Sequence, residues 1–187
     1  MMRIGVLSVQ GAFAEHSVKL RKYGAETFEI RQKSDISDAF DGLVLPGGES
    51  TVMRKLLHDL ELYEPLKVRI ENGLPVLATC AGMILLAKNV EGGEPCFGTM
   101  DITVKRNAYG RQLGSFRCTE TFDGKPIEMP FIRAPFVSDT GSAKVLASHD
   151  NRIVAVKQGA QLACAFHPEL TDDSTVYDYF MNDCKEE

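Results

Sequence analysis

The sequence predicts an α/β protein with a mostly parallel central sheet, helices on both faces and added antiparallel strands in the C-terminal half. Over the first 90 residues, short apolar segments alternate with segments of helical spacing, which is typical of a doubly wound sheet. The apolar segments are continuous, as expected for strands that are buried on both faces. After residue 99 the segments shorten and several alternate polar and apolar residues, which favours antiparallel pairing.

The first half of the chain is expected to supply the parallel strands and the covering helices. The expected strands are 4–9, 26–30, 41–50 (running into a glycine turn) and 75–79, and the expected helices are 12–24, 51–63, 65–73 and 81–89. Gly24 suits the C-terminal cap of the first helix, and Pro65 suits the first turn of the third. Ser50 or Thr51 can cap the second helix.

The second half is expected to be rich in strands and to end in a helix. The expected strands are 99–106, 112–121, 128–137, 143–149, 152–158 and 161–168, and the terminal helix is 172–183. Gly159 and Ala160 separate two of these segments, which predicts an antiparallel hairpin of 152–158 with 161–166. Because no linker, repeat or low-complexity segment interrupts the chain, residues 1–187 are expected to form a single domain.

Composition limits the partners that this protein can have. The 44% hydrophobic and 25% charged residues are those of an ordinary globular protein. A net charge of −5 argues against nucleic acid or an anionic membrane as partner, since both need a basic face. No apolar run approaches the roughly 20 residues of a bilayer span. The apolar stretch at the N-terminus is short and is predicted to be a strand, not a targeting signal. We expect a cytoplasmic protein.

The cysteines are too few and too scattered to form a disulfide framework. They are Cys80, Cys96, Cys118, Cys164 and Cys184, an odd number without any C-x-x-C pair. This spacing also argues against a structural zinc site, and no metal or cofactor is expected. Most of these thiols are expected to be inert core or surface groups.

Three unusual turns follow predicted strands, where open parallel sheets bind their ligands. They are LPGGES at 45–50, ATCAGM at 78–83 and FHPEL at 166–170. Taken singly each is a weak signal, since a Gly-Gly pair is often only a tight turn and a lone cysteine is more often packing. A His-Pro-Glu sequence near a chain end is usually a surface turn. Together the three turns supply the groups of a nucleophilic active site.

Cys80 is the candidate nucleophile. It lies between a strand and a helix and is flanked by Ala78, Ala81 and Gly82, whose small side chains permit a sharp turn and the approach of a substrate. The N-terminal end of the following helix favours an anionic sulfur. The backbone N–H of Ala81 is a natural oxyanion donor, and a second can come from the Gly47-Gly48 turn, for which we choose Gly48.

His167 is the best candidate base among the four histidines. His16 and His58 lie in predicted amphipathic helices, where a solvent-facing or boundary position is expected. His149 precedes a predicted turn and is not expected to reach Cys80. In an extended segment, residues i and i+2 point to the same side, so Glu169 is expected beside His167. Glu169 can then orient the imidazole, as in other nucleophile–base–acid triads.

These motifs resemble those of the class I (triad) glutamine amidotransferases. The G-x-C-x-G elbow of that family is matched by Ala78-Thr79-Cys80-Ala81-Gly82, and its H-x-E motif by His167-Pro168-Glu169. More narrowly, the chain resembles the glutaminase subunits of pyridoxal 5′-phosphate synthases. Six segments match in order, at 9–16, 43–51, 79–87, 106–112, 131–135 and 166–171. One departure is Ala78, which replaces the first glycine of the elbow and is expected to be a small perturbation.

The resemblance implies a flavodoxin-like class I glutamine amidotransferase fold and a set of substrate-binding residues. These are Gly47, Gly48, Glu49, Arg106, Ile132 and Arg133. An arginine suits the α-carboxylate of glutamine, and a carboxylate or carbonyl group suits its ammonium. Without the resemblance, surface solvation would be the simpler interpretation of Arg106 and Arg133. Arg111 stays a candidate for contact with substrate or partner.

The resemblance further implies that L-glutamine is hydrolysed to glutamate and that the ammonia passes to a synthase subunit making pyridoxal 5′-phosphate (vitamin B6). It implies an assembly of twelve glutaminase and twelve synthase subunits, in which glutaminase activity depends on the complex. Residues 9–16 could contribute to docking, because they lie near the end of the first strand.

Three other functions stay open at this point. The first is a triad glutaminase of imidazole-glycerol phosphate or purine synthesis, against which the segments 106–112 and 131–135 argue. The second is an enzyme of the intracellular peptidase and glyoxalase-like group, against which the late position of His167 argues. The third is a non-catalytic subunit that only binds and regulates the synthase.

Overall fold

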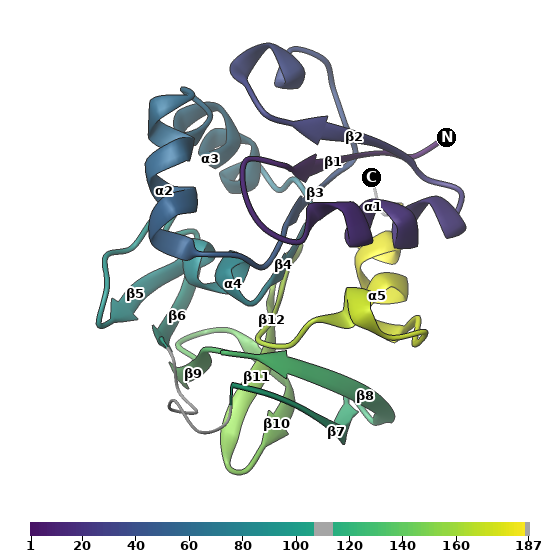
Figure 1. Cartoon of the computed structure of the whole chain (residues 1–187), viewed down its shortest axis with the longest axis vertical. Helices are drawn as coiled ribbons and strands as arrows, with labels where there is room; N and C mark the ends of the chain where they lie inside the picture. The colour runs from purple at the N-terminus through teal and green to yellow at the C-terminus, as the bar shows by residue number, and fades with distance from the viewer. Residues whose placement is uncertain (107–113, 186–187) are drawn as a thin grey trace.

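The computed structural model describes residues 1–106 and 114–185, which form α-helices and a large mixed sheet (Figure 1). The strands are β1 (Arg3–Leu7), β2 (Glu26–Ile30), β3 (Gly42–Leu45), β4 (Val76–Thr79), β5 (Ala87–Glu91), β6 (Met100–Lys105), β7 (Ser115–Phe122), β8 (Lys125–Ile132), β9 (Phe136–Asp139), β10 (Lys144–His149), β11 (Arg152–Gln158) and β12 (Gln161–Cys164). The α-helices are α1 (Phe13–Lys22), α2 (Ser50–Asp59), α3 (Tyr63–Glu71), α4 (Ala81–Leu86) and α5 (Thr175–Asp183). Two short 3-10 helices are η1 (Lys33–Ile36) and η2 (Pro168–Leu170).

The parallel part of the sheet has the strand order β2-β1-β3-β4-β12. Every residue of β3 and β4 is buried, which confirms that their continuous apolar sequences belong to strands covered on both faces. Helices α1 and α5 cover one face, and α2, α3 and α4 cover the other (Figure 1). The predicted α/β class with helices on both faces is therefore confirmed.

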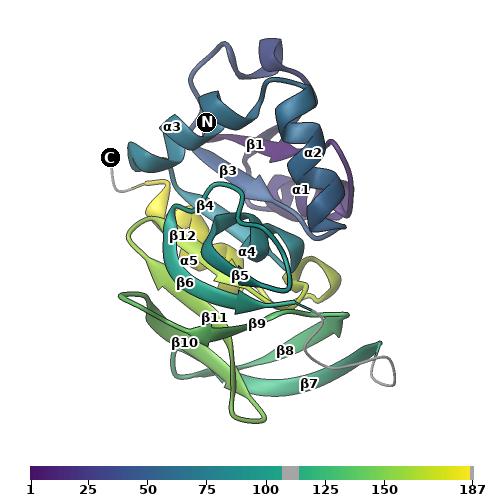
Figure 2. The same cartoon turned by 90° about the vertical axis from the view of Figure 1, so that its left-hand side faces the viewer.

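The antiparallel part continues the sheet from β12 through β11, β9 and β6. The predicted hairpin is confirmed, since β11 and β12 pair antiparallel with Gln158 opposite Gln161. Strands β7 and β8 form a separate two-stranded sheet, which lies with β10 at the end of the molecule opposite β1 (Figure 2). Buried side chains from both halves join in one hydrophobic cluster.

Several predicted boundaries are wrong. The predicted helix 81–89 ends at Leu86, and Ala87 turns to extended backbone to begin β5. Residues 87–89 carry no local signal that stops a helix, so the pairing of β5 with β6 sets this boundary. The predicted strand 128–137 is split into β8 and β9. Arg133 adopts a φ of 46° there, and Pro135 has no N–H for a ladder bond. Strand 161–168 ends early, at Cys164.

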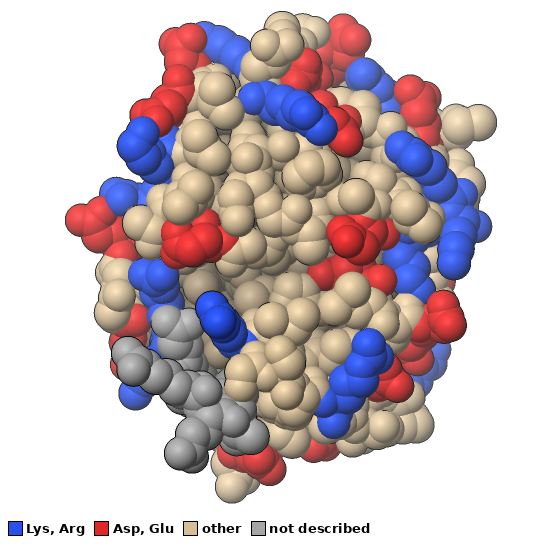
Figure 3. All heavy atoms as spheres, viewed as in Figure 1, with Lys and Arg blue, Asp and Glu red and all other residues tan. Residues whose placement is uncertain are grey.

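The surface carries both signs of charge. On the face seen in Figure 1, lysine and arginine side chains are interspersed with aspartate and glutamate, with uncharged residues between them (Figure 3). In the part of the chain that the structure describes, no helix is long and apolar enough to cross a membrane.

Gly82, in the first turn of α4, allows that helix to lie directly against the end of β3. A Cβ at this position would lie 2.1 Å from the carbonyl oxygen of Leu45, which is backbone and cannot move aside. Close contact between α4 and β3 therefore requires glycine, and the start of α4 fixes the turn that contains Cys80. Ala78 is fully buried in β4, where the packing accommodates its methyl group.

Substituting Gly82→Ala is expected to lower the free energy of unfolding by about 1–3 kcal/mol, because the added methyl forces α4 away from β3. Urea denaturation measures this change. Gly114→Ala is the matched control, since a Cβ there meets open space and is expected to change stability by no more than ~0.5 kcal/mol. Equal stability of the two variants would contradict the close-packing argument.

Candidate active site

Cys80 forms a strained elbow between β4 and α4. Its φ of 48° and ψ of −106° lie in a region that side chains other than glycine rarely adopt. Two backbone hydrogen bonds hold it there. The N–H of Cys80 donates to the carbonyl of Cys164 (2.8 Å), and the N–H of Met83 donates to the carbonyl of Cys80 (3.1 Å). A strained, well-held elbow is typical of nucleophiles presented at a sheet edge.

Sheet pairing brings His167 to this elbow. Strand β12 lies parallel to β4 with Cys164 opposite Thr79, so the chain leaves both strands at the same edge. The N–H of His167 then donates to the carbonyl of Pro130 (2.8 Å), which ties this segment to β8. Cys80 and His167 are both largely buried.

Glu169 supports the imidazole of His167 from behind. Its Oε1 lies 2.6 Å from Nδ1 of His167. The carboxylate accepts the Nδ1 proton, which leaves Nε2 on the side of Cys80. The expected neighbour relation is confirmed, but the reason given for it is wrong. Residues 168–170 form the 3-10 helix η2 and are not extended, so a tight turn brings Glu169 back to His167.

Opposing effects set the charge of His167. Burial favours the neutral ring, but Cys80 and the Glu169 carboxylate together raise the pKa of His167 to about 10. Burial likewise disfavours the charged form of Glu169, yet His16 and His167 hold its pKa below the ordinary value. Among the described residues, Nε2 of His167 makes no hydrogen bond, and the Cys80 thiol donates to the carbonyl of Ile132 (3.8 Å). The unpartnered Nε2 is the atom of the ring that can exchange a proton with Cys80 or with a substrate.

The elbow opens into a pocket of about 510 Å³, a size suited to a small metabolite. Its walls are Gln10, Gly11, Ala12, Gly47, Gly48, Glu49, Ser50, Cys80, Ala81, Ile84, Arg106, Ile132, Arg133 and His167. Gly47 lies against both reactive groups, since a Cβ there would come within 2.5 Å of the His167 ring and 3.4 Å of the Cys80 Cβ. Only glycine leaves room for a substrate amide beside them.

Glu49 and Arg106 form one charged wall of the pocket. Arg106 donates to Oε1 of Glu49 (3.2 Å). The same carboxylate accepts the N–H groups of Thr51 (3.2 Å) and Val52 (2.7 Å), so Glu49 caps α2 in place of the predicted Ser50 or Thr51. Although some burial opposes it, these N–H donors and Arg106 lower the pKa of Glu49, which stays anionic.

Arg133 supplies a second positive charge. Its strained backbone, with φ 46°, places it at the pocket between β8 and β9, next to Ile132. Within the described residues its guanidinium has no hydrogen bond or ion pair, so it is available to an anionic group of a ligand.

Comparison with known proteins agrees with this geometry. Residues 6–186 match the model of the SNO glutamine amidotransferase family. The chain belongs to this family. It is 58% identical over 182 residues to the pyridoxal 5′-phosphate synthase subunit PdxT of Methanocorpusculum labreanum, covering 96% of each chain. It is 49% identical over 185 residues to the protein of the same name from Carboxydothermus hydrogenoformans, again covering 96% of each.

A solved glutamine amidotransferase structure has the same fold as this SNO family member. The TM-score is 0.91 at 38% sequence identity, and the match covers 97% of this chain and 98% of the other. The flavodoxin-like class I glutamine amidotransferase fold implied by the sequence motifs is therefore confirmed.

The structure brings most of the predicted site residues of this amidotransferase together. Cys80, His167 and the six substrate-binding candidates all line the pocket, as does Ala81, while Glu169 lies behind His167. Arg111 and the rest of the 107–112 segment lie outside the described residues. The roles assigned to these residues stay predictions.

Sequence reasoning linked residues 9–16 to docking but did not place Gln10, Gly11 and Ala12 at the pocket. The Oε1 of Gln10 accepts the N–H of Glu49 (2.8 Å), and the N–H of Ala12 donates to the carbonyl of Gly47 (3.0 Å). This loop therefore holds the glycine turn in place. Its position after a predicted buried strand was the available signal, since such loops meet at one sheet edge.

The other three histidines are placed as follows. His58 is exposed, as expected, and His149 lies away from the pocket on β10. The expectation for His16 is wrong, because it is fully buried and faces Glu169. Its helix packs against both α5 and the end of β4, so the side expected to face solvent or a boundary is covered.

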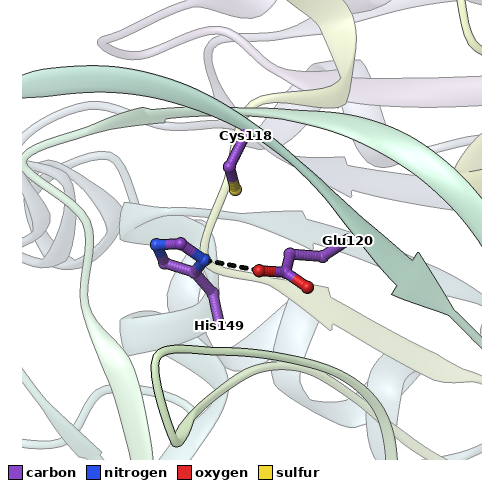
Figure 4. A group of neighbouring side chains, drawn as sticks. All are labelled: Cys118, Glu120 and His149. Atoms are coloured by element: carbon purple, nitrogen blue, oxygen red, sulfur yellow. Dashed lines mark hydrogen bonds and ion pairs between the residues drawn. The ribbon is translucent and has the colours of Figure 1, made fainter.

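One further group of side chains could hold a metal among the residues that the structure describes. Cys118 and Glu120 on β7 and His149 on β10 have donor atoms within 4.8 Å of one another (Figure 4). Nδ1 of His149 lies 2.8 Å from Oε1 of Glu120, and its ring stacks on Phe131. None of the three lines the pocket, and these contacts join β7 to β10.

Substituting Glu169→Gln is expected to lower the pKa of His167 from about 10, because the neutral amide no longer stabilises the imidazolium while burial still disfavours it. The measurement is an NMR titration of the His167 Cε1–H signal in both proteins. An unchanged His167 titration would contradict the assigned role of Glu169.

Proposed function

We propose that this chain hydrolyses the side-chain amide of L-glutamine to glutamate and ammonia. The observation that carries the proposal is the strained Cys80 elbow beside His167, backed by Glu169, at the wall of a pocket with two arginines. Membership of the SNO glutamine amidotransferase family supports the same reaction.

In the first step, Nε2 of His167 takes the thiol proton of Cys80, and the sulfur attacks the side-chain carbonyl carbon of glutamine. The carbonyl oxygen becomes an oxyanion, which accepts hydrogen bonds from the N–H groups of Ala81 and Gly48. Ala81 is the first residue of α4, and the first N–H groups of a helix have no partner within it. His167 then donates its Nε2 proton to the leaving nitrogen, which departs as ammonia and leaves a thioester on Cys80.

In the second step, His167 removes a proton from a water molecule that attacks the thioester. The tetrahedral intermediate collapses, glutamate leaves, and the proton returns to the Cys80–His167 pair. Glu169 keeps Nδ1 of His167 protonated throughout, so only Nε2 exchanges protons with the reactants. The balance is glutamine plus water giving glutamate plus ammonia, and no step calls for a metal or cofactor.

Charged groups of the pocket orient the amino-acid end of glutamine. Arg133 pairs with the α-carboxylate, because its charge is not neutralised by another described residue. Arg106 is held by Glu49 and completes this wall, and the carboxylate of Glu49 or the carbonyls of the glycine turn receive the ammonium. Ile132 covers the aliphatic part of the substrate at the pocket entrance.

The ammonia is proposed to pass to a pyridoxal 5′-phosphate synthase subunit. The relatives named PdxT are subunits of that synthase, and they align with nearly the whole chain. Residues 1–187 would act as a single glutaminase domain in an assembly of twelve glutaminase and twelve synthase subunits. Residues 9–16 would contribute to docking, because Gln10, Gly11 and Ala12 among them line the pocket.

Substituting Cys80→Ala is expected to reduce glutamate release by ~10³-fold or more, because no other group can form the thioester. The assay measures glutamate from glutamine, with this chain alone and with a pyridoxal 5′-phosphate synthase subunit added. Cys118→Ser is the matched control, since this thiol lies on β7 outside the pocket, and it should keep wild-type activity.

Each outcome of this assay has a separate meaning. Activation by the synthase subunit that is absent in Cys80→Ala supports both the triad and the pathway. Activity that ignores the synthase subunit keeps the triad but points to another acceptor of ammonia, such as imidazole-glycerol phosphate or purine synthesis. No glutamate under either condition would favour a non-catalytic regulatory subunit.

Substituting Arg133→Ala is expected to raise KM for glutamine by about 10- to 100-fold with little change in kcat, because a charged hydrogen bond to the substrate carboxylate is lost. Steady-state kinetics of the complex measures both constants. Arg21→Ala is the control, because this exposed arginine donates to the hydroxyl of Thr27 and does not line the pocket. An unchanged KM would remove Arg133 from the substrate site.

A further inference from the structure

His16, in α1, is a fully buried histidine that the reaction described above does not use. Its ring connects three elements. Nδ1 lies 2.8 Å from the hydroxyl of Tyr177 on α5, and Nε2 lies 3.1 Å from the hydroxyl of Thr79 at the end of β4. Nε2 also lies 3.5 Å from Oε2 of Glu169. A buried imidazole with this set of contacts has a defined orientation.

The contacts also select the position of the ring proton. Burial lowers the pKa of His16, so the ring is neutral and carries one N–H. If the proton were on Nδ1, the lone pair of Nε2 would face the carboxylate of Glu169, which is unfavourable. Burial raises the pKa of Tyr177, so its hydroxyl stays protonated and donates to Nδ1. The proton of His16 therefore lies on Nε2, between Thr79 and Glu169.

Glu169 needs such a donor. It is only 5% exposed, and a buried carboxylate is costly unless hydrogen bonds surround it. Its Oε1 is bound by His167, whereas Oε2 has no hydrogen bond within normal distance among the described residues. The N–H of His16 is the donor that faces Oε2.

We propose that His16 is a positioning residue that holds Glu169 ionised and correctly oriented for His167. This inference rests on the proposed glutaminase function and adds a residue to its site. The carboxylate lies between two imidazoles, of which His167 exchanges protons and His16 does not. Because α1 follows the pocket loop at Gln10–Ala12, His16 also ties that loop to the catalytic acid.

The other titratable groups facing Glu169 do not compete for this role. Burial raises the pKa of both Cys164 and Tyr177, so both stay neutral near Glu169. Glu15, whose charge also acts on His16, is an exposed residue of α1. Loss of the His16 N–H is therefore expected to raise the pKa of Glu169, since the charged form loses a donor.

The test uses His16→Leu and His16→Gln, assayed as the complex with the synthase subunit. The leucine variant should lower kcat by about 10- to 100-fold, the size of loss seen when the hydrogen-bond partner of a metal-bound histidine is removed, and leave KM unchanged. The acid limb of the pH profile should move to higher pH, because Glu169 becomes protonated more easily. Glutamine retains an N–H near the position of Nε2 and should restore most of kcat.

Ser17→Ala is the matched control. Ser17 is buried on the same helix and donates to the carbonyl of Phe13, away from the triad, so its loss should leave kcat and the pH profile unchanged. If His16→Leu does not fold, Tyr177→Phe carries the test. This variant keeps the ring volume but removes the donor that fixes the proton on Nε2, so a smaller change in the same direction is expected.

A second readout separates this inference from the proposed function. The side-chain carboxyl signal of Glu169, followed by carbon NMR, should titrate at higher pH in His16→Leu and Tyr177→Phe than in the wild type. This measurement does not need catalysis. If the wild type releases no glutamate, the proposed function fails while the Glu169 titration still tests His16. Wild-type titration of Glu169 in both variants would overturn the positioning role.

Discussion

The parallel pairing of β12 with β4 is the constraint on which the site depends. Because Cys164 lies opposite Thr79, the Cys80 elbow after β4 and the His167 segment after β12 leave the sheet at the same edge. The hydrogen bond from Cys80 N–H to the Cys164 carbonyl continues this pairing by one residue, so the nucleophile itself belongs to the ladder. A slip in this register would separate the sulfur from the imidazole and turn buried side chains outward.

The surrounding structure holds two unfavourable features in place. One is the strained backbone of Cys80. It is maintained by the close packing of α4 on β3, which is possible because Gly82 has no side chain. The other is the buried charge of Glu169, which hydrogen bonding to His167 and the facing His16 offset. Both features orient groups of the Cys80–His167–Glu169 triad. The loss of stability therefore falls at the residues whose geometry the reaction requires to be fixed.

Several residues serve the fold and the pocket together. Glu49 caps α2 and holds Arg106, so the start of a helix and one wall of the pocket share a carboxylate. The loop after β1 binds the glycine turn through Gln10 and Ala12. These bonds connect β1, β3 and α2 around the pocket. A movement of the Gln10–Ala12 loop would therefore displace the glycine turn beside Cys80.

The sequence by itself determined the α/β class, the buried parallel strands and the residues that carry the chemistry, because apolar runs and short motifs such as those at Cys80 and His167 are local properties. It did not determine where α4 becomes β5, since residues 87–89 carry no local stop signal and the pairing of β5 with β6 sets the boundary. The structure also decided the position of His16. Helical spacing shows which residues share a face, but only packing of α1 against α5 and β4 decides that this face is buried beside Glu169. Contacts between residues so distant in the chain arise from tertiary packing and leave no local pattern.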